Sequence, residues 1–186
     1  MTVDIHVTSG VHTPGGGRPG RNVDTVGLFN KKAAGTPVRT LVSRPDRRVF
    51  GADSTGWWCY ADACVQYTVR HSERRVGTDL LAEQGDKWLG EGEWGPAARC
   101  LGLAIEQIQS AALGGPYRAP DEMTDEPILT SYRRAMLMSL AEHHDFADGL
   151  RADVEHKANL LESIADSGCG TMYRTAAKEL RQLFVG

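Results

Sequence analysis

The hydrophobic residues of this sequence change their spacing near residue 77, and this change constrains the fold more than any other feature. From residue 78 onward, apolar side chains recur every three or four positions, which is the period of an amphipathic helix. Before residue 77, several short segments alternate between apolar and polar residues, which is the period of a half-buried strand. The sequence therefore predicts an α+β protein with a β-rich first part and a helical second part.

Five short segments of the first part have the residue types and the alternation of strands: 3–7, 38–42, 48–50, 57–60 and 64–71. The links between the last four are too short for crossover connections, so we expect a short antiparallel β-meander. Residues 9–22 hold seven glycines and prolines and predict a Gly/Pro-rich arm or loop.

Five segments of the second part have helical periodicity: 78–90, 96–112, 128–143, 150–165 and 171–184. Residues 115–127 are rich in proline and acidic side chains and predict a connection. We expect a bundle of about four α-helices, because amphipathic helices with short links pack antiparallel. The main core should contain the apolar residues of the last three helices: Tyr132, Met136, Leu140, Val154, Leu161, Ile164, Tyr173, Leu180 and Leu183.

The charges also divide the chain near residue 77. Residues 1–77 carry 11 basic and 6 acidic side chains, a net charge of +5. Residues 78–186 carry 10 basic and 18 acidic side chains, a net charge of −8, and the two values give the −3 of the whole chain. The basic part could attract an anionic partner, or the two parts could simply attract each other. At this length we expect one compact unit.

The sequence shows no export signal, which would be a basic amino-terminal region followed by an apolar run. It also has no apolar stretch long enough to cross a bilayer. We therefore expect a cytoplasmic protein with no membrane partner, in which the four cysteines are thiols or metal ligands. The basic residues are mainly arginine, which is typical of GC-rich genomes such as those of actinobacteria and their phages and bears only on origin.

A zinc site is one candidate for chemistry. Cys59 and Cys64 flank a four-residue turn between two expected strands, and this spacing lets two sulfurs share one tetrahedral zinc. Cys100 and His71 are the candidates for the remaining ligands. The alternative is that these cysteines are small buried core residues, which is a common role for free thiols.

A second candidate is the acidic and histidine-rich cluster Glu142, His143, His144 and Asp145 at the end of an expected helix. Carboxylates and imidazoles this close together could hold a metal or transfer protons. The alternative is structural, because histidines at a helix carboxyl terminus are stabilised by the helix dipole, and His143 also continues an apolar stripe.

A third candidate is a partner-binding surface on the basic first part. Its basic and aromatic side chains are Arg18, Arg21, Lys31, Lys32, Arg47, Arg48, Trp57 and Trp58. Arginine and lysine bind phosphates of nucleic acids, and tryptophan is frequent in protein interfaces. The alternatives are a solvated basic surface and two tryptophans covered by the helical part.

No nucleophile lies in a recognisable catalytic motif. We therefore expect a non-enzymatic binding or regulatory protein, which engages a protein or nucleic-acid partner through its basic first part. The alternative is a metal-dependent hydrolase that uses the cluster from Glu142 to Asp145. Zinc is the one cofactor that the sequence suggests.

Overall fold

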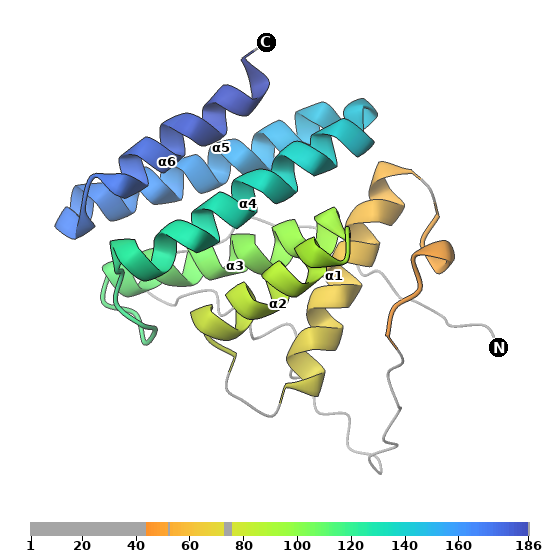
Figure 1. The fold of residues 1–186 in the computed structure, drawn as a ribbon, viewed down its shortest axis with the longest axis horizontal. Coiled ribbons are helices and arrows are strands. Elements are labelled where there is room, and N and C mark those ends of the chain that lie inside the picture. The colour runs from red at the N-terminus through yellow and green to blue at the C-terminus, as the bar shows by residue number, and fades with distance from the viewer. Residues whose placement is uncertain (1–43, 52, 73–75, 186) are drawn as a thin grey trace, which may run out of the picture. The chain divides into compact units, whose positions relative to one another are not determined.

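The computed structural model describes residues 44–51, 53–72 and 76–185, and this part of the chain folds into helices. Short single-turn helices precede α1 and connect or end some of the others (Figure 1). The six α-helices of the described part are α1 (Ser54–His71), α2 (Thr78–Gly90), α3 (Trp94–Ala112), α4 (Glu122–Glu142), α5 (Ala147–Ile164) and α6 (Met172–Arg181).

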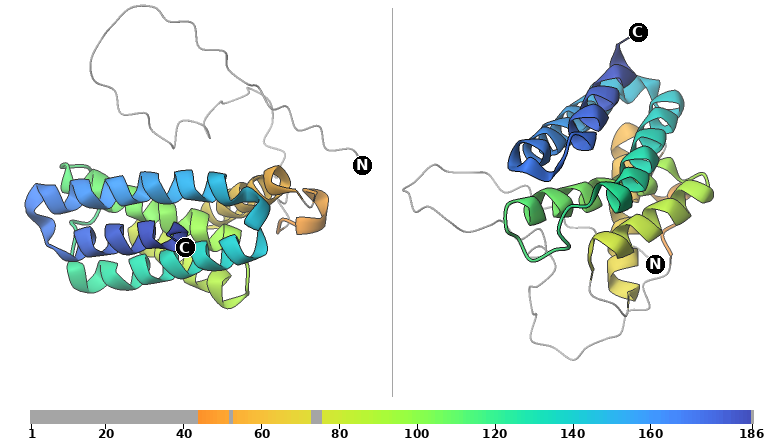
Figure 2. Two further views of the ribbon diagram at one scale, coloured as in Figure 1. Left: turned by 90° about the horizontal axis from the view of Figure 1, so that it is seen from above. Right: turned by 60° about the vertical axis from the view of Figure 1, so that its left-hand side comes forward.

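Helix α3 is the centre of the bundle. It packs against α1 and α2 on one side and against α4 and α5 on the other. Helix α6 packs on α5 and α4, on the side of the bundle away from α2 (Figures 1 and 2). Because α3 has helices on both sides, ten of its residues are buried, whereas a helix on the surface of a bundle buries one stripe.

Small residues let the helices approach α3 closely. A Cβ atom added at Gly85 of α2 would come within 2.5 Å of Leu101 Cγ on α3. A Cβ atom added at Gly102 would lie 3.0 Å from Cε of Lys157, whose side chain runs across α3 from α5. The close packing of α3 with α2 and α5 therefore depends on these two glycines.

The predicted β-meander is wrong wherever the structure describes it, and so is the α+β class for this part of the chain. Segments 57–60 and 64–71 belong to one continuous helix, α1. Its buried residues fall at spacings of three and four and form one helical stripe that includes Trp57, Ala61, Cys64 and Thr68. Asp53 caps the helix, because its carboxylate accepts a hydrogen bond of 2.7 Å from the backbone N–H of Gly56.

Segment 48–50 is not a strand either. Arg47–Val49 form a single helical turn, and the Asp46 carboxylate accepts a hydrogen bond from the backbone N–H of Arg48. The strands expected at 3–7 and 38–42 and the Gly/Pro-rich arm at 9–22 lie outside the described residues. The boundary near residue 77 and the single compact unit remain predictions.

The helices predicted after residue 78 are present, and the predicted core is largely correct. Seven of the nine predicted core residues are buried, and Leu140 and Leu183 are partly buried against the same core. The core extends beyond the prediction, because it also contains Ile105 and Ile108 of α3 and Trp57 of α1. Among the helices that the structure describes, none has the length and apolar character needed to span a membrane.

Helix α4 begins earlier than the sequence predicted. It starts at Glu122 rather than at residue 128 and includes Pro127. The carboxylate of Asp121 accepts a hydrogen bond of 3.0 Å from the backbone N–H of Met123 and caps the first turn. The prediction placed the start too late because proline usually ends or begins a helix, whereas here it lies in the second turn.

Candidate functional site

The structure does not bring the four candidate zinc ligands together. Cys59 and Cys64 lie on the same helix, where five residues correspond to a rotation of roughly 140°, so their side chains diverge. Cys59 is exposed, whereas Cys64 and Cys100 are buried, and burial raises the pKa of the Cys64 thiol to about 11. His71 is exposed at the end of α1, where its Nδ1 lies 2.9 Å from the carbonyl oxygen of Tyr67. Within the described part of the chain, no group of three or more His, Cys, Asp or Glu side chains could hold a metal.

The side chains of the cluster from Glu142 to Asp145, at the end of α4, do not gather around one point. His143 is buried and packs on the Trp57 ring, with the two ring centroids 4.9 Å apart. Its Nε2 lies 3.3 Å from an Arg47 guanidinium nitrogen, and it must accept this hydrogen bond because a guanidinium can only donate. Burial lowers the pKa of His143, which favours this neutral form. His144 and Asp145 are exposed.

The other member of this cluster, Glu142, accepts a 2.8 Å hydrogen bond from Arg47. Arg47 therefore joins the segment before α1 to the end of α4 through two contacts. These contacts give Glu142 and His143 a structural role at the end of α4. No observation on the described residues favours the metal-dependent hydrolase.

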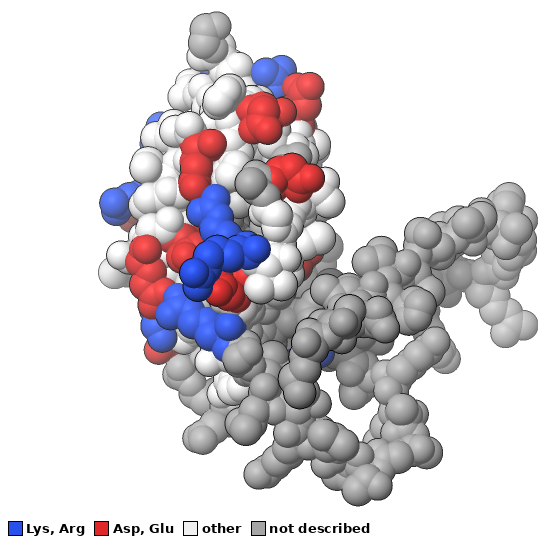
Figure 3. All heavy atoms as spheres, turned by 90° about the vertical axis from the view of Figure 1, so that its right-hand side faces the viewer, with Lys and Arg blue, Asp and Glu red and all other residues white. Residues whose placement is uncertain are grey.

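The predicted partner-binding residues have different environments. Arg48 is exposed and pairs with Asp46 at 2.9 Å, so its charge is partly neutralised. Trp57 is buried, whereas Trp58 is half-buried beneath the Arg99 guanidinium, 5.2 Å from its ring centroid. Basic and acidic side chains lie beside one another on the face shown in Figure 3. The remaining predicted partner-binding residues, Arg18, Arg21, Lys31 and Lys32, lie outside the described part.

Two open depressions lie on the described surface. The first, which we name the α1–α2 cleft, has a volume of about 560 Å³ and lies between the end of α1, α2 and the segment before α1. Arg44, His71 and Lys87 supply its basic groups, and Tyr67 and Trp88 supply its aromatic rings. Its other described lining residues are neutral, and none of those that line it is a carboxylate.

Arg44 is held in place over the floor of the α1–α2 cleft. Its guanidinium lies 4.5 Å from the centroid of the Trp88 ring and forms an ion pair with Glu91. The hydrogen bond that Arg44 donates to the Glu91 carboxylate raises the pKa of Arg44, so the guanidinium stays charged. Half of the Arg44 side chain is still exposed. A guanidinium stacked on an indole and open on its other side can contact an anion or a planar ring.

The opposite wall of the cleft carries a second aromatic group. Tyr67 and His71 are one turn apart on α1, and their ring centroids are 4.2 Å apart. Lys87 is exposed on α2 and has no ion-pair partner among the described residues. The Nε1 atom of Trp88 is buried and has no hydrogen-bond partner in the described structure. The cleft therefore combines positive charge with flat rings.

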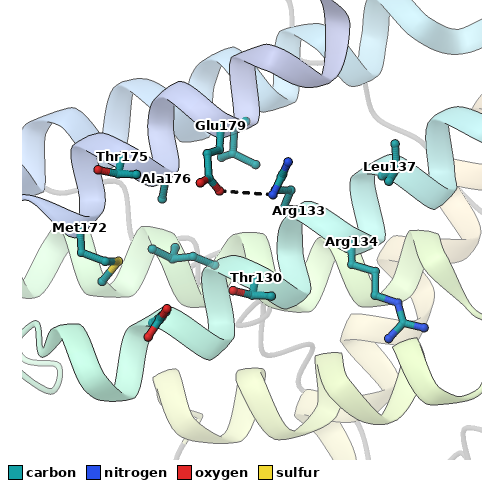
Figure 4. A pocket seen from close by; sticks show the side chains of 11 residues that line it. Thr130, Arg133, Arg134, Leu137, Met172, Thr175, Ala176 and Glu179 are labelled. Atoms are coloured by element: carbon teal, nitrogen blue, oxygen red, sulfur yellow. Dashed lines mark hydrogen bonds and ion pairs between the residues drawn. The ribbon is translucent and has the colours of Figure 1, made fainter.

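The second depression, which we name the α4–α6 groove, has a volume of about 460 Å³ (Figure 4). Leu129, Ala176 and Leu180 contribute apolar surface to its lining. Two arginines and two glutamates lie along it, so its formal charge is balanced: Arg133, Arg134, Glu126 and Glu179. Arg133 reaches across to Glu179 of α6 at 3.3 Å, whereas Arg134 points away from α6 (Figure 4).

A buried carboxylate ties α4 to α6 near this groove. Asp125 of α4 is fully buried and accepts a 2.7 Å hydrogen bond from the hydroxyl of Tyr173 on α6. It also accepts hydrogen bonds from Arg118 at 2.5 Å and from the backbone N–H of Asp121 at 3.0 Å. Because all these partners are donors, the charge of Asp125 is compensated and the two helices are held together.

A second buried charge lies between α3 and α5. Lys157 is almost fully buried and forms an ion pair with Glu106 at 2.5 Å. Asp153, one turn earlier on α5, is 3.9 Å from the Lys157 Nζ and accepts a 2.7 Å hydrogen bond from Tyr132. This network is satisfied within the fold and lines neither depression, so we assign it a structural role.

The α1–α2 cleft was not predicted from the sequence. Tyr67 and His71 belong to a segment that was predicted to be a strand, and Lys87 and Trp88 belong to a segment that was predicted to be a helix. A local signal did exist, because Tyr67 and His71 are four residues apart and therefore share a helical face. The approach of Arg44 to Trp88 spans 44 positions and follows only from the tertiary fold.

The comparisons add no relative to this description. No protein-family model, curated protein or solved structure matches the chain. The geometry of the two depressions is therefore what indicates a function.

Proposed function

We propose that this chain is a nucleic-acid-binding protein, and that its α1–α2 cleft receives the sugar-phosphate backbone and a base of a single strand. One observation carries the proposal: the cleft combines Arg44, His71 and Lys87 with two aromatic rings and has no carboxylate among its described lining residues. Non-sequence-specific single-strand binding uses this combination, in which cations follow the phosphates and aromatic side chains stack on bases.

The charges around the cleft support this choice over a neutral ligand. Arg44 and Lys87 give its lining a formal charge of +2, of which the Arg44 charge is partly neutralised by Glu91 outside the lining, although the sequence from residue 78 onward is net acidic. The volume of about 560 Å³ lies within the range of small-molecule sites and would accept one nucleotide unit of a longer strand.

The basic residues that precede Arg44 in the sequence extend the proposal. Arg18, Arg21, Lys31 and Lys32 would add positive charge that attracts the phosphates of a nucleic acid, as would the exposed Arg48. Such charge strengthens binding without reading the base sequence. A protein partner on the same basic surface is the alternative, and the experiment below separates the two.

The test is fluorescence anisotropy of a labelled oligothymidylate with the full chain over a series of salt concentrations. The double variant Arg44→Gln/Lys87→Gln should bind at least roughly 10-fold more weakly at low salt, because two phosphate contacts are lost. The slope of log K against log salt should become shallower by about 1.4, at about 0.7 for each lost contact with a single strand.

The matched control is Arg151→Gln/Lys178→Gln, which removes the same charge from exposed positions on α5 and α6. It should leave the salt slope nearly unchanged. If both double variants weaken binding equally, the effect is one of net charge and the cleft is not the site. If the full chain shows no binding at low salt, the proposal of nucleic-acid binding fails.

A further inference from the structure

Helix α4 has an outward face that carries two exposed large apolar side chains, Met123 and Leu137. Met123 and Leu137 are 85% and 50% exposed, and Thr130 lies midway between them and is also exposed. Successive members of this set are seven residues apart, which is about two helical turns, so all three lie on one face. The inward face of α4 is buried in the core through Tyr132 and Met136. The outward apolar residues therefore contribute nothing to the core of this chain.

The charges on this outward face follow the same spacing. Glu126 and Arg134 are each four residues from Thr130, on either side of it, and both are exposed. Neither has an ion-pair partner among the described residues, although Arg133 next to them pairs with Glu179. A negative and a positive group are thus placed symmetrically about the centre of the face.

This arrangement is self-complementary. If a second α4 lies antiparallel on the first with the two Thr130 residues at the centre, Met123 of one copy faces Leu137 of the other. In the same register, Glu126 of one copy comes opposite Arg134 of the other. A twofold axis repeats each contact, and the small Thr130 permits close approach where the helices cross.

The α4–α6 groove gives the second helix a place to lie. Its apolar surface comes from both helices, through Leu129 and Leu137 of α4 and Met172 and Ala176 of α6 (Figure 4). Its formal charge is balanced, which suits a partner with the same balanced surface. A nucleic acid is disfavoured here because two glutamates lie along the groove.

We propose that the chain forms a homodimer with twofold symmetry, in which α4 of each copy packs antiparallel in the α4–α6 groove of the other. The surface is separate from the α1–α2 cleft, so the dimer is independent of the proposed nucleic-acid binding. If both hold, the dimer carries two clefts.

The first test is sedimentation equilibrium of the full chain at micromolar concentrations, where the mass of a dimer is expected. Leu137→Glu should raise the dissociation constant roughly 100-fold, because each interface contains this residue twice in an apolar setting. Its circular dichroism spectrum and melting curve under monomeric conditions should match those of the parent, since Leu137 points away from the core. A monomer at all concentrations, or a dimer insensitive to Leu137→Glu, would overturn the proposal.

The second test uses charge exchange. Glu126→Arg and Arg134→Glu should each weaken the dimer, because like charges then face each other across the interface. The double variant Glu126→Arg/Arg134→Glu should restore it, because it re-creates the opposite-charge pairs with exchanged sign. Single variants that have no effect, or a double variant weaker than both, would show that these residues do not face each other.

A cysteine at the centre tests the register directly. Thr130→Cys should form an intermolecular disulfide under mild oxidation, because the twofold axis brings the two copies of this position together. His156→Cys on the exposed side of α5 is the control and should not form one at the same protein concentration. Both variants are made in a Cys59→Ser/Cys169→Ser background to remove the other accessible thiols.

Discussion

The α1–α2 cleft and the α4–α6 groove are both open spaces between two helices, but they differ in charge and in the groups that support them. Arg44 and Lys87 line the cleft and none of its described lining residues is acidic, whereas arginines and glutamates balance along the groove. Near the groove, the buried carboxylate of Asp125 accepts hydrogen bonds from two side chains and one backbone N–H. Beneath the cleft, the Nε1 atom of Trp88 has none among the described residues.

The difference indicates two kinds of surface. A balanced, mainly apolar groove braced by a satisfied buried network suits a preformed protein contact. A cationic cleft with aromatic side chains suits an anionic ligand that has planar rings. The same bundle can therefore provide an interface between copies on one surface and a ligand site on another.

The largest effect should follow from removing the support near the groove. Asp125→Ala should lower the free energy of unfolding by about 3 to 5 kcal/mol, because it leaves Tyr173 and Arg118 without their shared acceptor. Urea denaturation measures this loss. The control Asp166→Ala removes an exposed pair with Arg174 and should cost at most about 1 kcal/mol. Equal costs for the two variants would mean that the groove is not braced by Asp125.

An intermediate effect is expected for the thiols of α1, which forms one wall of the cleft. Burial raises the pKa of Cys64 from 9.0 to about 11, so at a given pH below 9 its thiolate fraction is about one hundredth of that of a thiol with a pKa of 9.0. At pH 8, the exposed Cys59 should react with a thiol reagent much faster than Cys64, which is buried and has little thiolate.

The readout is the rate of Ellman's reaction in the folded chain, compared with that of the Cys59→Ser variant. Loss of the fastest phase in the variant would identify it as Cys59. Cys169 is partly exposed and should give a slower phase in both proteins. Rapid reaction of Cys64 in the folded chain would show that the wall of the cleft opens easily or that α1 has another register.

The smallest effect should come from the floor of the cleft. Trp88→Phe should change the free energy of unfolding by about 1 kcal/mol or less, because the loss of packing is offset by removal of a buried donor without a partner. Leu81→Ala on the same helix has no such compensation and should cost about 2 to 5 kcal/mol. Far-UV circular dichroism in urea compares them. If Trp88→Phe costs as much as Leu81→Ala, the indole N–H has a partner in solution.

The sequence alone predicted the helices after residue 78, because the period of their apolar residues is a local property. Leu161 and Ile164 on α5, and Tyr173 and Leu180 on α6, were predicted to be buried from spacing alone, and they are. Gly168, which follows α5, has a φ of 88°, a conformation that glycine adopts without strain.

The same local reasoning failed for α1, because its sequence fits both the two-residue period of a strand and the 3.6-residue period of a helix. Val65, Tyr67 and Val69 alternate as in a strand and have residue types that favour strands. Trp57, Ala61, Cys64 and Thr68 are spaced as on a helix, and the contact of this stripe with α3 decides the outcome. Propensity is a weak preference, and burial against a neighbouring helix outweighs it.

Only the tertiary structure decided the candidate sites. The contacts that form these sites join residues far apart in the sequence. Asp125 and Tyr173 are 48 positions apart, Arg44 and Trp88 are 44 apart, and Arg47 and His143 are 96 apart. Hydrophobic period fixes which face of a helix is buried, but it leaves open which helices become neighbours. The two depressions depend on that choice of neighbours, because the cleft forms where Arg44 lies over Trp88 beside the end of α1, and the groove forms where α4 and α6 pack against each other.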